Sequence, residues 1–339
     1  MRILFVGGPG NISASCARLC VERGMEVVLL NRGGRHPEVE GARTLIADMA
    51  NTAQARELLR HEHFDTVADF IAFTPAHVER DIAFFAGHTR QYFFISSASA
   101  YQKPLVHPVV SESTPLKNPF WEYSRNKIAC EDLLTAAYRE RDFPAVIVRP
   151  SHTYATIWPV AIGPSSDFTL IDRVRRGGAL IVHGDGSTLW TVTHSDDFAQ
   201  GFVGLVGNDA AVGHAFQITS DESLSWNQIA ATICEAAGVE PRIVHIPSQF
   251  LAERDEELRG SLFGDKVFSP IFDNAKIKRF VPGFCATIPF HVGIRRTLAW
   301  FEARPERRTV DDAANQALDA LIAAWKSVSP SASPLDGRE

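Results

Sequence analysis

The stretch MRILFVGGPGNIS, residues 1–13, decides the fold. Apolar residues from Ile3 to Val6 predict a buried strand, and glycines follow it at once. Gly7 permits a tight turn, and Gly10 permits the backbone to approach a pyrophosphate closely. The helix that begins near Asn11 then directs free N–H groups and the positive end of its dipole at that anion. This order of strand, glycine loop and helix predicts a dinucleotide-binding loop.

Ser13 stands where a third glycine would complete the fingerprint. That position serves the packing of helix on strand rather than ligand contact, and serine is small enough to be tolerated there. A glycine turn without any ligand remains the alternative interpretation of this motif when it is taken alone.

The first 150 residues alternate between short apolar runs and helical stretches. Strands are predicted at Ile3–Val6, Val27–Leu30, Thr44–Ala47, Val67–Ile71, Tyr92–Ser96 and Ala145–Arg149. Helices are predicted at Ser13–Arg23, Thr52–His61, Ala76–Ala86 and Trp121–Arg141. The alternation indicates an α/β fold, a Rossmann-type doubly wound parallel sheet with helices on both faces. Such sheets bind ligands at the carboxyl ends of their strands.

Residues 1–150 therefore form the predicted dinucleotide-binding domain. Beyond them the strand signals become sparse and the loops lengthen, so we expect a mainly substrate-binding region at 151–326, with segments that return to the sheet. Helices are predicted there at Leu224–Ala237 and Val310–Trp325. The last residues, 327–339, are rich in Ser and Pro and are predicted to form a flexible tail.

The end of the second strand bears on the choice of cofactor. An acidic residue there would bind both ribose hydroxyls of NAD, but this chain has Asn31 followed by Arg32 and, further on, Arg35. A neutral side chain beside arginines suits a 2′-phosphate, so the pattern favours NADP over NAD. Plain solvation of the arginines is the competing interpretation. Asp48, which closes the third strand, is placed either to reach the adenine edge or to cap the next helix.

Tyr123 and Lys127 in WEYSRNK are four residues apart and share one helical face. A fixed ammonium nearby favours a phenolate, so we expect Lys127 to lower the pKa of Tyr123. Tyr123 would then exchange a proton with an alcohol or ketone while a nicotinamide exchanges the hydride. Lys127 is also placed to hydrogen-bond the nicotinamide ribose. Ser97, just past the fifth strand, is placed to donate to the reacting oxygen, with Ser96 and Ser99 as substitutes.

Together these motifs resemble the extended short-chain dehydrogenase/reductase family, the NAD-dependent epimerase/dehydratase group. The resemblance covers about residues 1–300 and rests, in order, on GGPGNIS, SSASAY, YSRNK, RPSHTY, HGDG and THSDDFAQG. It implies a seven-stranded Rossmann sheet with a smaller C-terminal substrate domain. It implies a catalytic triad of Ser97, Tyr123 and Lys127, and cofactor-binding positions at Gly7, Gly10, Ile12, Arg32 and Asp48. It also implies a homodimer built on two long helices, one of which carries Tyr123.

Two departures from that family bear on the substrate. Ala98 and Ser99 stand where sugar-nucleotide dehydratases have an Asp-Glu pair, so elimination of water lacks a proton shuttle and a 4,6-dehydratase is not expected. Trp190 stands where sugar-nucleotide enzymes commonly have an arginine that clamps the diphosphate. An indole instead stacks on a sugar or another flat apolar face. The arginines at 173, 175 and 176 are alternative partners for a diphosphate.

These residues predict an enzyme that oxidises or reduces a secondary alcohol or ketone of a sugar or sugar-nucleotide. A sugar epimerase and a keto-sugar reductase fit the residues equally. His152, after the sixth strand, is a candidate substrate contact or additional acid-base group, with a satisfied buried histidine as the alternative. A non-catalytic NAD(P)-binding redox sensor and an RNA-binding member of the same fold are the remaining alternatives. Sensors of this kind usually lose the Tyr–Lys pair, which this chain keeps.

Composition narrows the class of protein further. The 339 residues are 45% hydrophobic and 22% charged, which predicts an ordinary globular core. A net charge of −6 argues against a nucleic-acid or anionic-membrane surface. Five cysteines fit no disulfide or metal spacing, and the resemblance makes His194 and its aspartates structural, so no metal is expected. With no signal-peptide pattern and no bilayer-length apolar run, we expect a cytoplasmic protein.

Overall fold

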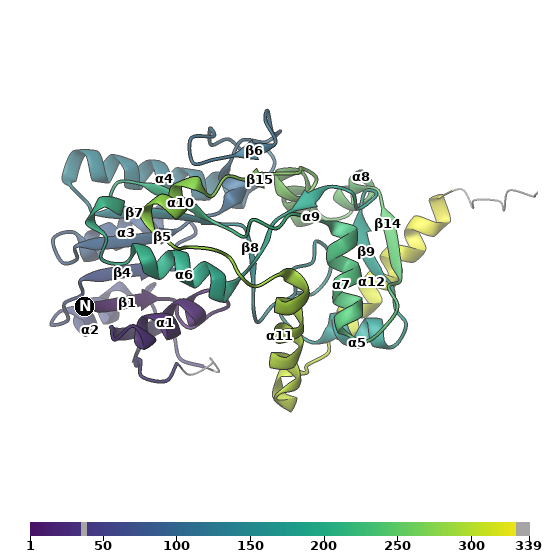
Figure 1. Cartoon of the computed structure of the whole chain (residues 1–339), viewed down its shortest axis with the longest axis horizontal. Coiled ribbons are helices and arrows are strands. Elements are labelled where there is room, and N and C mark those ends of the chain that lie inside the picture. Colours follow the sequence, from purple (N-terminus) through teal and green to yellow (C-terminus); the bar gives the residue numbers. More distant parts are fainter. Residues whose placement is uncertain (35–38, 330–339) are drawn as a thin grey trace, which may run out of the picture.

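A seven-stranded sheet organises the first half of the chain (Figure 1). In spatial order its strands are β12 (Ala215–Ile218), β7 (Ala145–Pro150), β5 (Gln91–Ile95), β4 (Thr66–Asp69), β1 (Arg2–Val6), β2 (Glu26–Asn31) and β3 (Arg43–Ile46). Each neighbouring pair is parallel. The computed structural model describes residues 1–34 and 39–329. The predicted doubly wound Rossmann-type sheet is confirmed.

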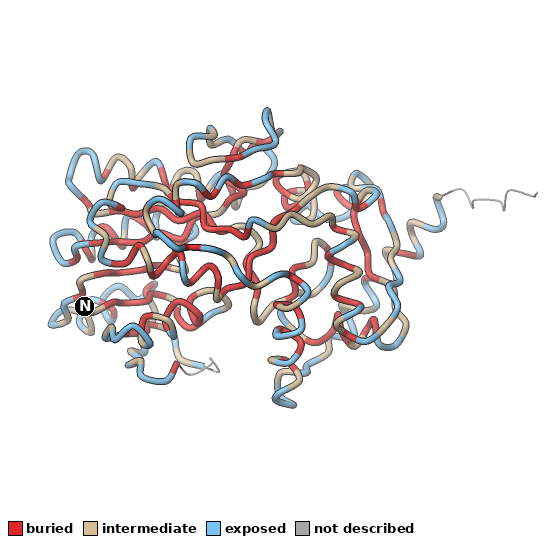
Figure 2. The backbone as a smooth tube through the Cα atoms, viewed as in Figure 1, coloured by how far each residue is buried: buried red, intermediate tan, exposed pale blue. Residues whose placement is uncertain are grey.

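The central strands are buried on both faces, because helices cover both sides of the sheet (Figure 2). Along β1, Ile3 and Phe5 enter one apolar core while Leu4 and Val6 enter the other. The first core lies under α1 (Ser13–Glu22) and α6 (Ser195–Leu205). The second lies under α2 (Thr52–Leu59), α3 (Pro75–Phe85) and α4 (Glu122–Arg141).

The second half of the chain is built from two-stranded sheets and short helices. The strand pairs are β8 (His152–Tyr154) with β11 (Val192–His194), β9 (Leu180–His183) with β14 (Ile243–Ile246), β10 (Leu189–Trp190) with β13 (Leu224–Ser225), and β6 (Val109–Val110) with β15 (Ile271–Phe272). The helices are α5 (Thr169–Arg175), α7 (Trp226–Ala236), α8 (Ser248–Ala252), α9 (Glu256–Ser261), α10 (Ala275–Phe280), α11 (Phe290–Glu302) and α12 (Asp312–Val328). A separate aromatic core holds this region together.

Several later segments return to the main sheet, since β12 forms its edge and α10 packs on β12 and α6. The helix predicted from Leu224 starts at Trp226, because Ser225 caps it in a reciprocal pair with Gln228. The last helix runs to Val328, so the tail predicted from 327 begins inside it, and residues 330–339 lie outside the described part. Within residues 1–34 and 39–329, no helix is both long enough and apolar enough to cross a bilayer.

Candidate active site

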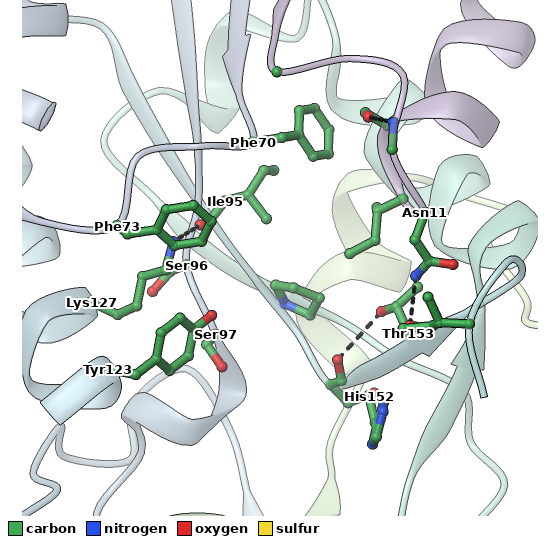
Figure 3. Close-up of a pocket in the computed structure, with 17 residues that line it drawn as sticks. Asn11, Phe70, Phe73, Ile95, Ser96, Ser97, Tyr123, Lys127, His152 and Thr153 are labelled. Carbon is green, nitrogen blue, oxygen red and sulfur yellow. Dashed lines mark hydrogen bonds between the residues drawn. The ribbon is translucent and has the colours of Figure 1, made fainter. Parts of the chain in front are cut away.

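A cavity of about 350 Å³ opens at the carboxyl ends of β1, β4, β5 and β7 (Figure 3). It brings together eight of the residues that the sequence predicts for the site: Gly7, Gly10, Asn11, Ile12, Ser97, Tyr123, Lys127 and His152. The other lining residues include Ser13, Phe70, Phe73, Ile95, Ser96 and Thr153. Figure 3 shows Tyr123, Ser97 and Lys127 on one wall, with Asn11 and Thr153 on the wall opposite.

The glycine loop forms one end of the cavity, and its geometry requires glycine. Gly7 has φ +84°, and a Cβ there would lie 2.2 Å from the Cγ2 of Ile71. The Ser13 hydroxyl accepts the Gly10 N–H at 2.7 Å, so the residue that departs from the fingerprint fixes the loop. Bare backbone at the start of α1 suits the pyrophosphate of a dinucleotide, and the residues present fit that group.

Lys127 is held rigidly at the floor of the cavity. Its Nζ donates to the carbonyls of Ala72 and Ile95, both at 2.7 Å. The ammonium also lies 4.7 Å from the ring centre of Phe73. Burial lowers the pKa of Lys127 to about 8. The backbone that accepts these bonds fixes the direction in which the ammonium points.

Asp69, which sequence reasoning missed, supports this arrangement. Its Oδ1 accepts the N–H groups of Ile71 at 2.5 Å and Ala72 at 2.7 Å. The loop after β4 is thereby folded so that the Ala72 carbonyl faces Lys127. An acidic residue that ends a buried strand was the available signal for this role.

Tyr123 is partly buried at the first turn of α4, with its ring centre 4.8 Å from that of Trp121. Burial raises the pKa of its phenol to about 12, and the Ser97 hydroxyl offsets part of that rise. The predicted lowering of this pKa by Lys127 is wrong for the chain as it stands. Burial dominates, because Lys127 points its Nζ at two backbone carbonyls, 5.8 Å from the Tyr123 ring centre.

The three serines after β5 have distinct positions. Ser97 lines the cavity, and its hydroxyl lies 2.9 Å from that of Ser99. Ser99 accepts a hydrogen bond from Ser124 at 2.7 Å and is 1% exposed, so it lies behind Ser97 rather than in the cavity. Ser96 donates to the Glu131 carboxylate. Ser99 was predicted as a substrate contact; the structure instead gives it the role of positioning Ser97.

Glu131 and Arg149 form a buried ion pair beneath the site that sequence reasoning also missed. The Arg149 Nε donates to Glu131 at 3.0 Å, and the two side chains are 5% and 3% exposed. The pair raises the pKa of Arg149 well above its ordinary value. Glu131 lies four residues after Lys127, so helical spacing was the signal that places it on the same face of α4.

Comparison with known proteins places the chain in a family. The model of the family described as NAD dependent epimerase/dehydratase matches residues 3–219. The chain belongs to the NAD-dependent epimerase/dehydratase family. The expected enzyme of the extended short-chain dehydrogenase/reductase type is thereby confirmed.

Similar proteins of this family carry several activities. A 2′-dehydrokanamycin reductase of Streptomyces kanamyceticus is 25% identical, over 84% of this chain and 80% of its own length. A trifunctional UDP-glucose 4,6-dehydratase/UDP-4-keto-6-deoxy-D-glucose 3,5-epimerase/UDP-4-keto-L-rhamnose-reductase of Arabidopsis thaliana is 24% identical over 76% of this chain, which spans 39% of that protein. A chloroplast stem-loop binding protein of 41 kDa from the same plant is 25% identical over 74% of this chain and 67% of its own length.

Solved structures share the fold. The dTDP-glucose 4,6-dehydratase of Bacillus anthracis, in complex with NAD, has a TM-score of 0.72 at 15% identity, over 90% of this chain and 98% of its own. The UDP-glucuronic acid 4-epimerase of Bacillus cereus, in complex with UDP-glucuronic acid and NAD, has a TM-score of 0.70 at 18% identity, over 89% and 99%. The expected seven-stranded Rossmann architecture is confirmed.

Within this family architecture, Asn11 joins the two halves of the chain. Its Nδ2 donates to the Thr153 carbonyl at 2.8 Å, and its Oδ1 accepts the N–H groups of Ala155 at 2.9 Å and Thr156 at 3.0 Å. The sequence predicts Asn11 as a cofactor contact. The structure engages its amide with the backbone of residues 153–156, so it ties the glycine loop to β8 as well.

The remaining cofactor positions lie away from this cavity. Asn31 bonds the Gly8 carbonyl at 2.8 Å and the Gly33 N–H at 2.9 Å, and it lines a second cavity of about 710 Å³ beside β2 and β3. Arg32 is exposed. Asp48 accepts the N–H of Ala50 at 2.9 Å in a local turn. Arg35 lies outside the described residues.

Asp48 therefore does not cap the helix that follows. Asn51 is the N-cap of α2, since its side chain accepts the Gln54 N–H at 3.2 Å. The capping role that the sequence allowed for Asp48 is wrong, because Asn51, directly before the first residue of α2, holds the N-cap position.

His152 lines the cavity opposite Tyr123 and is half-buried. Burial, followed by the positive charge of Lys266, lowers the pKa of His152 to about 3. The imidazole is therefore neutral at physiological pH and offers hydrogen bonds rather than charge. The additional acid-base role allowed by the sequence does not fit a ring that stays uncharged.

Trp190 does not face the cavity. It is 2% exposed and stacks on Trp226, with ring centres 6.1 Å apart and an interplanar angle of 21°. The prediction that its indole stacks on a sugar is wrong, because β10 turns the side chain into the aromatic core of the second half.

The arginines predicted as diphosphate partners are all engaged elsewhere. Arg173, Arg175 and Arg176 pair with Asp319 at 2.6 Å, Glu302 at 2.8 Å and Asp172 at 3.0 Å, respectively. His194 accepts the Asp196 N–H at 3.2 Å through its Nδ1, and the Asp197 carboxylate accepts the N–H groups of residues 287 and 288. These side chains have structural roles in the described chain.

Proposed function

We propose that this chain transfers a hydride to a ketone, or from a secondary alcohol, of a sugar-like substrate. A keto-sugar reductase is the first form of this proposal and a sugar epimerase the second. The observation that carries it is one cavity lined by Tyr123, Lys127, Ser97 and the glycine loop. These are the groups that proton transfer beside a bound dinucleotide requires.

Each catalytic side chain has a defined task in this proposal. Because its pKa is about 12, Tyr123 holds its proton throughout the physiological range and donates it to the oxygen of a reacting ketone. Ser97 donates a hydrogen bond to the same oxygen, with Ser99 fixing its orientation. Lys127 places a positive charge near Tyr123 and would hydrogen-bond the ribose of a bound cofactor. A bound nicotinamide dinucleotide supplies or accepts the hydride.

One observation favours the reductase form, and a second disfavours a dehydratase. The 2′-dehydrokanamycin reductase matches this chain over most of both lengths. Ala98 and Ser99 provide no carboxyl group next to Ser97, so elimination of water has no acid-base pair at that position. An epimerase would need only the same three side chains, and it remains the second form. A stem-loop binding role, named for one relative, is disfavoured because this chain retains a complete Tyr–Lys–Ser set.

The test is consumption of NADPH or NADH by the purified protein with a panel of keto-sugars and keto-sugar nucleotides. We expect oxidation of the reduced cofactor with at least one ketone, and loss of about 10²-fold to 10⁴-fold of that rate in Tyr123→Phe, because the phenylalanine cannot donate a proton. Tyr138→Phe, on the exposed face of the same helix, is the matched control. Full turnover in Tyr123→Phe would overturn the assigned roles, and interconversion of sugars without net cofactor oxidation would indicate the epimerase.

NADP is the proposed cofactor, in preference to NAD. Asn31 lines the second cavity and supplies no carboxylate that would repel a 2′-phosphate, and the exposed Arg32 follows it in the chain. We expect Arg32→Ala to raise the KM for NADPH roughly 10-fold, with little change for NADH. Equal effects on both cofactors would remove the reason for preferring the phosphorylated form.

A homodimer is proposed through α3 and α4, which pack against each other on one face of the sheet. Light scattering should give a mass near twice the 37.4 kDa of the chain. A monomer mass at micromolar concentration would contradict this assembly.

A further inference from the structure

A π-helical turn, Leu262–Lys266, connects the catalytic helix to the second half of the chain. The Gly264 carbonyl accepts from Asn118 Nδ2 at 2.7 Å, just before α4. On the other side, the Lys266 carbonyl accepts from the Trp226 Nε1 at 3.2 Å. The turn is thus fixed from both regions, and such turns are frequent at functional sites.

The side chain of Lys266 lies against the aromatic residues next to Tyr123. Its Nζ lies 5.4 Å from the ring centre of Trp121, and that ring lies 4.8 Å from the ring of Tyr123. Burial lowers the pKa of both His152 and His183, and the positive charge of Lys266 lowers it further, so the ammonium lies within electrostatic reach of both imidazoles. Lys266 therefore lies beside Trp121, the neighbour of Tyr123, and within electrostatic reach of His152, while Tyr123 and His152 themselves line the cavity.

The ammonium of Lys266 has no carboxylate within ion-pair distance among the residues that the structure describes. The adjacent Asp265 is 8% exposed, and its Oδ1 lies 4.0 Å from the Nζ of Lys103, which is itself 2% exposed. The nearby Glu257 accepts the Trp121 Nε1 at 3.2 Å. Lys103 and Lys266 together match the carboxyl groups of Asp265 and Glu257 in number, but Lys266 forms no direct ion pair with either carboxylate.

His183 adds a second polar group at the same place. It is 2% exposed, and its Nε2 has no hydrogen-bond partner within the described part of the chain. The ring of Trp226 lies 5.5 Å from that of His183 and 6.5 Å from that of His152. A buried polar atom without a partner costs free energy, so a ligand atom that bonds it is favoured.

We propose that Lys266, together with His152 and His183, binds a negatively charged substituent of the substrate, a carboxylate or a phosphate. This inference rests on the proposed function, because it places that substituent beside the carbon that reacts at Tyr123. The ammonium supplies the charge, and the two neutral imidazoles supply hydrogen bonds. A neutral sugar would leave the partly desolvated Lys266 ammonium without a direct ion pair. The substrate class is therefore an acidic or phosphorylated sugar.

The test is binding measured by titration calorimetry, which does not depend on turnover. The probes are glucuronate, glucose 6-phosphate, inorganic phosphate and neutral glucose, each added to the full chain with NADP present. We expect one of the charged sugars to bind more tightly than glucose, and Lys266→Met to weaken it roughly 10-fold to 100-fold. Lys266→Arg should retain most of the affinity. Lys326→Met, on the exposed surface of α12, is the matched control and should change nothing.

The arms of this experiment separate the sources of the anion and the two proposals. Preference for glucuronate identifies a carboxylate, whereas preference for glucose 6-phosphate identifies a phosphate. Tyr123→Phe should bind the charged sugar as the original chain does. Loss of turnover with unchanged binding in this variant therefore tests the proposed reaction and not the proposed anion site. His183→Asn should also weaken binding of the charged sugar. A loss of affinity in both variants could not be explained by misfolding of Lys266→Met alone. Unchanged affinity in Lys266→Met, or a preference for neutral glucose, would overturn the inference.

Discussion

The two halves of the molecule treat buried charge differently. In the dinucleotide-binding half, the buried cations meet partners from the protein itself, as Lys127 meets two carbonyls and Arg149 meets Glu131. In the second half, Lys266 forms no direct ion pair with a carboxylate of the described chain, and the Nε2 of His183 has no hydrogen bond there. Arg173 in the second half does pair with Asp319, so the contrast concerns the groups near the candidate site: those of the first half are fixed by the protein, whereas Lys266 and His183 are left for the proposed ligand.

The architecture explains why the halves differ. A parallel sheet ends all its strands at one edge, so carbonyls and loops there converge on α4 and satisfy its charged side chains. The second half has only two-stranded sheets joined by longer loops, and its aromatic core brings Trp190, Trp226 and His183 together without a regular ladder. In such a region, whether a polar side-chain atom finds a hydrogen-bond partner depends on where the neighbouring side chains lie.

Breaking the buried ion pair should have the largest effect on stability. Arg149→Met leaves the Glu131 carboxylate buried without its cation, and we expect the free energy of unfolding to fall by about 3–5 kcal/mol. Urea denaturation measures this change. Arg90→Met is the control, since Arg90 and Asp209 form an exposed pair with 3.3 Å separation, for which less than about 1 kcal/mol is expected.

Lys266→Met is the variant to compare with Arg149→Met in the same urea denaturation. If the two halves differ as described, removing the Lys266 charge weakens ligand binding and leaves the unfolding midpoint nearly unchanged. Equal losses of stability in Arg149→Met and Lys266→Met would break the comparison between a rigid half and a ligand-binding half.

The pH dependence of the reaction tests the rigid half in another way. Because burial lowers the pKa of Lys127 from its ordinary value to about 8, the ammonium predominates below that pH and is lost above it. We expect the rate of ketone reduction to be level near neutrality and to fall about 10-fold per unit well above pH 8. In Lys127→Arg the guanidinium keeps its charge, so the decrease in rate above pH 8 should disappear from the measured pH range, even if the rate itself is lower. A falling limb at the same pH in both proteins would assign it to another group.

The sequence predicted the dinucleotide-binding half better than the second half. Apolar runs and glycine spacing predicted six strands of the main sheet, β1 to β5 and β7, within a few residues, because a buried parallel strand needs a continuous apolar run. The spacing of Tyr123 and Lys127 also placed both side chains in one cavity correctly. Backbone periodicity is local information, which a single sequence carries.

The fate of individual side chains was predicted less well. Trp190 was expected at the substrate, but the direction of a two-residue strand decided that it packs on Trp226. The pKa of Tyr123 was expected to fall, but burial by neighbouring rings raised it. Lys266 was not selected at all, because nothing in the sequence shows that a π-helical turn places its ammonium beside Trp121. Each of these outcomes depends on contacts between residues far apart in the chain.

The smallest change in stability and KM is expected for a substitution of Trp190, and it tests whether this residue belongs to the core or to the ligand site. Because Trp190 is 2% exposed and its Nε1 has no hydrogen-bond partner in the described chain, Trp190→Phe removes little besides part of a stacked ring. We expect the free energy of unfolding to fall by less than about 1.5 kcal/mol, and the KM for the substrate to stay within about 2-fold. Trp226→Phe is the matched variant, since it also removes the bond from Nε1 to the Lys266 carbonyl that fixes the π-helical turn. The KM for a charged sugar should therefore rise more in Trp226→Phe than in Trp190→Phe, and the reverse order would return Trp190 to the substrate site.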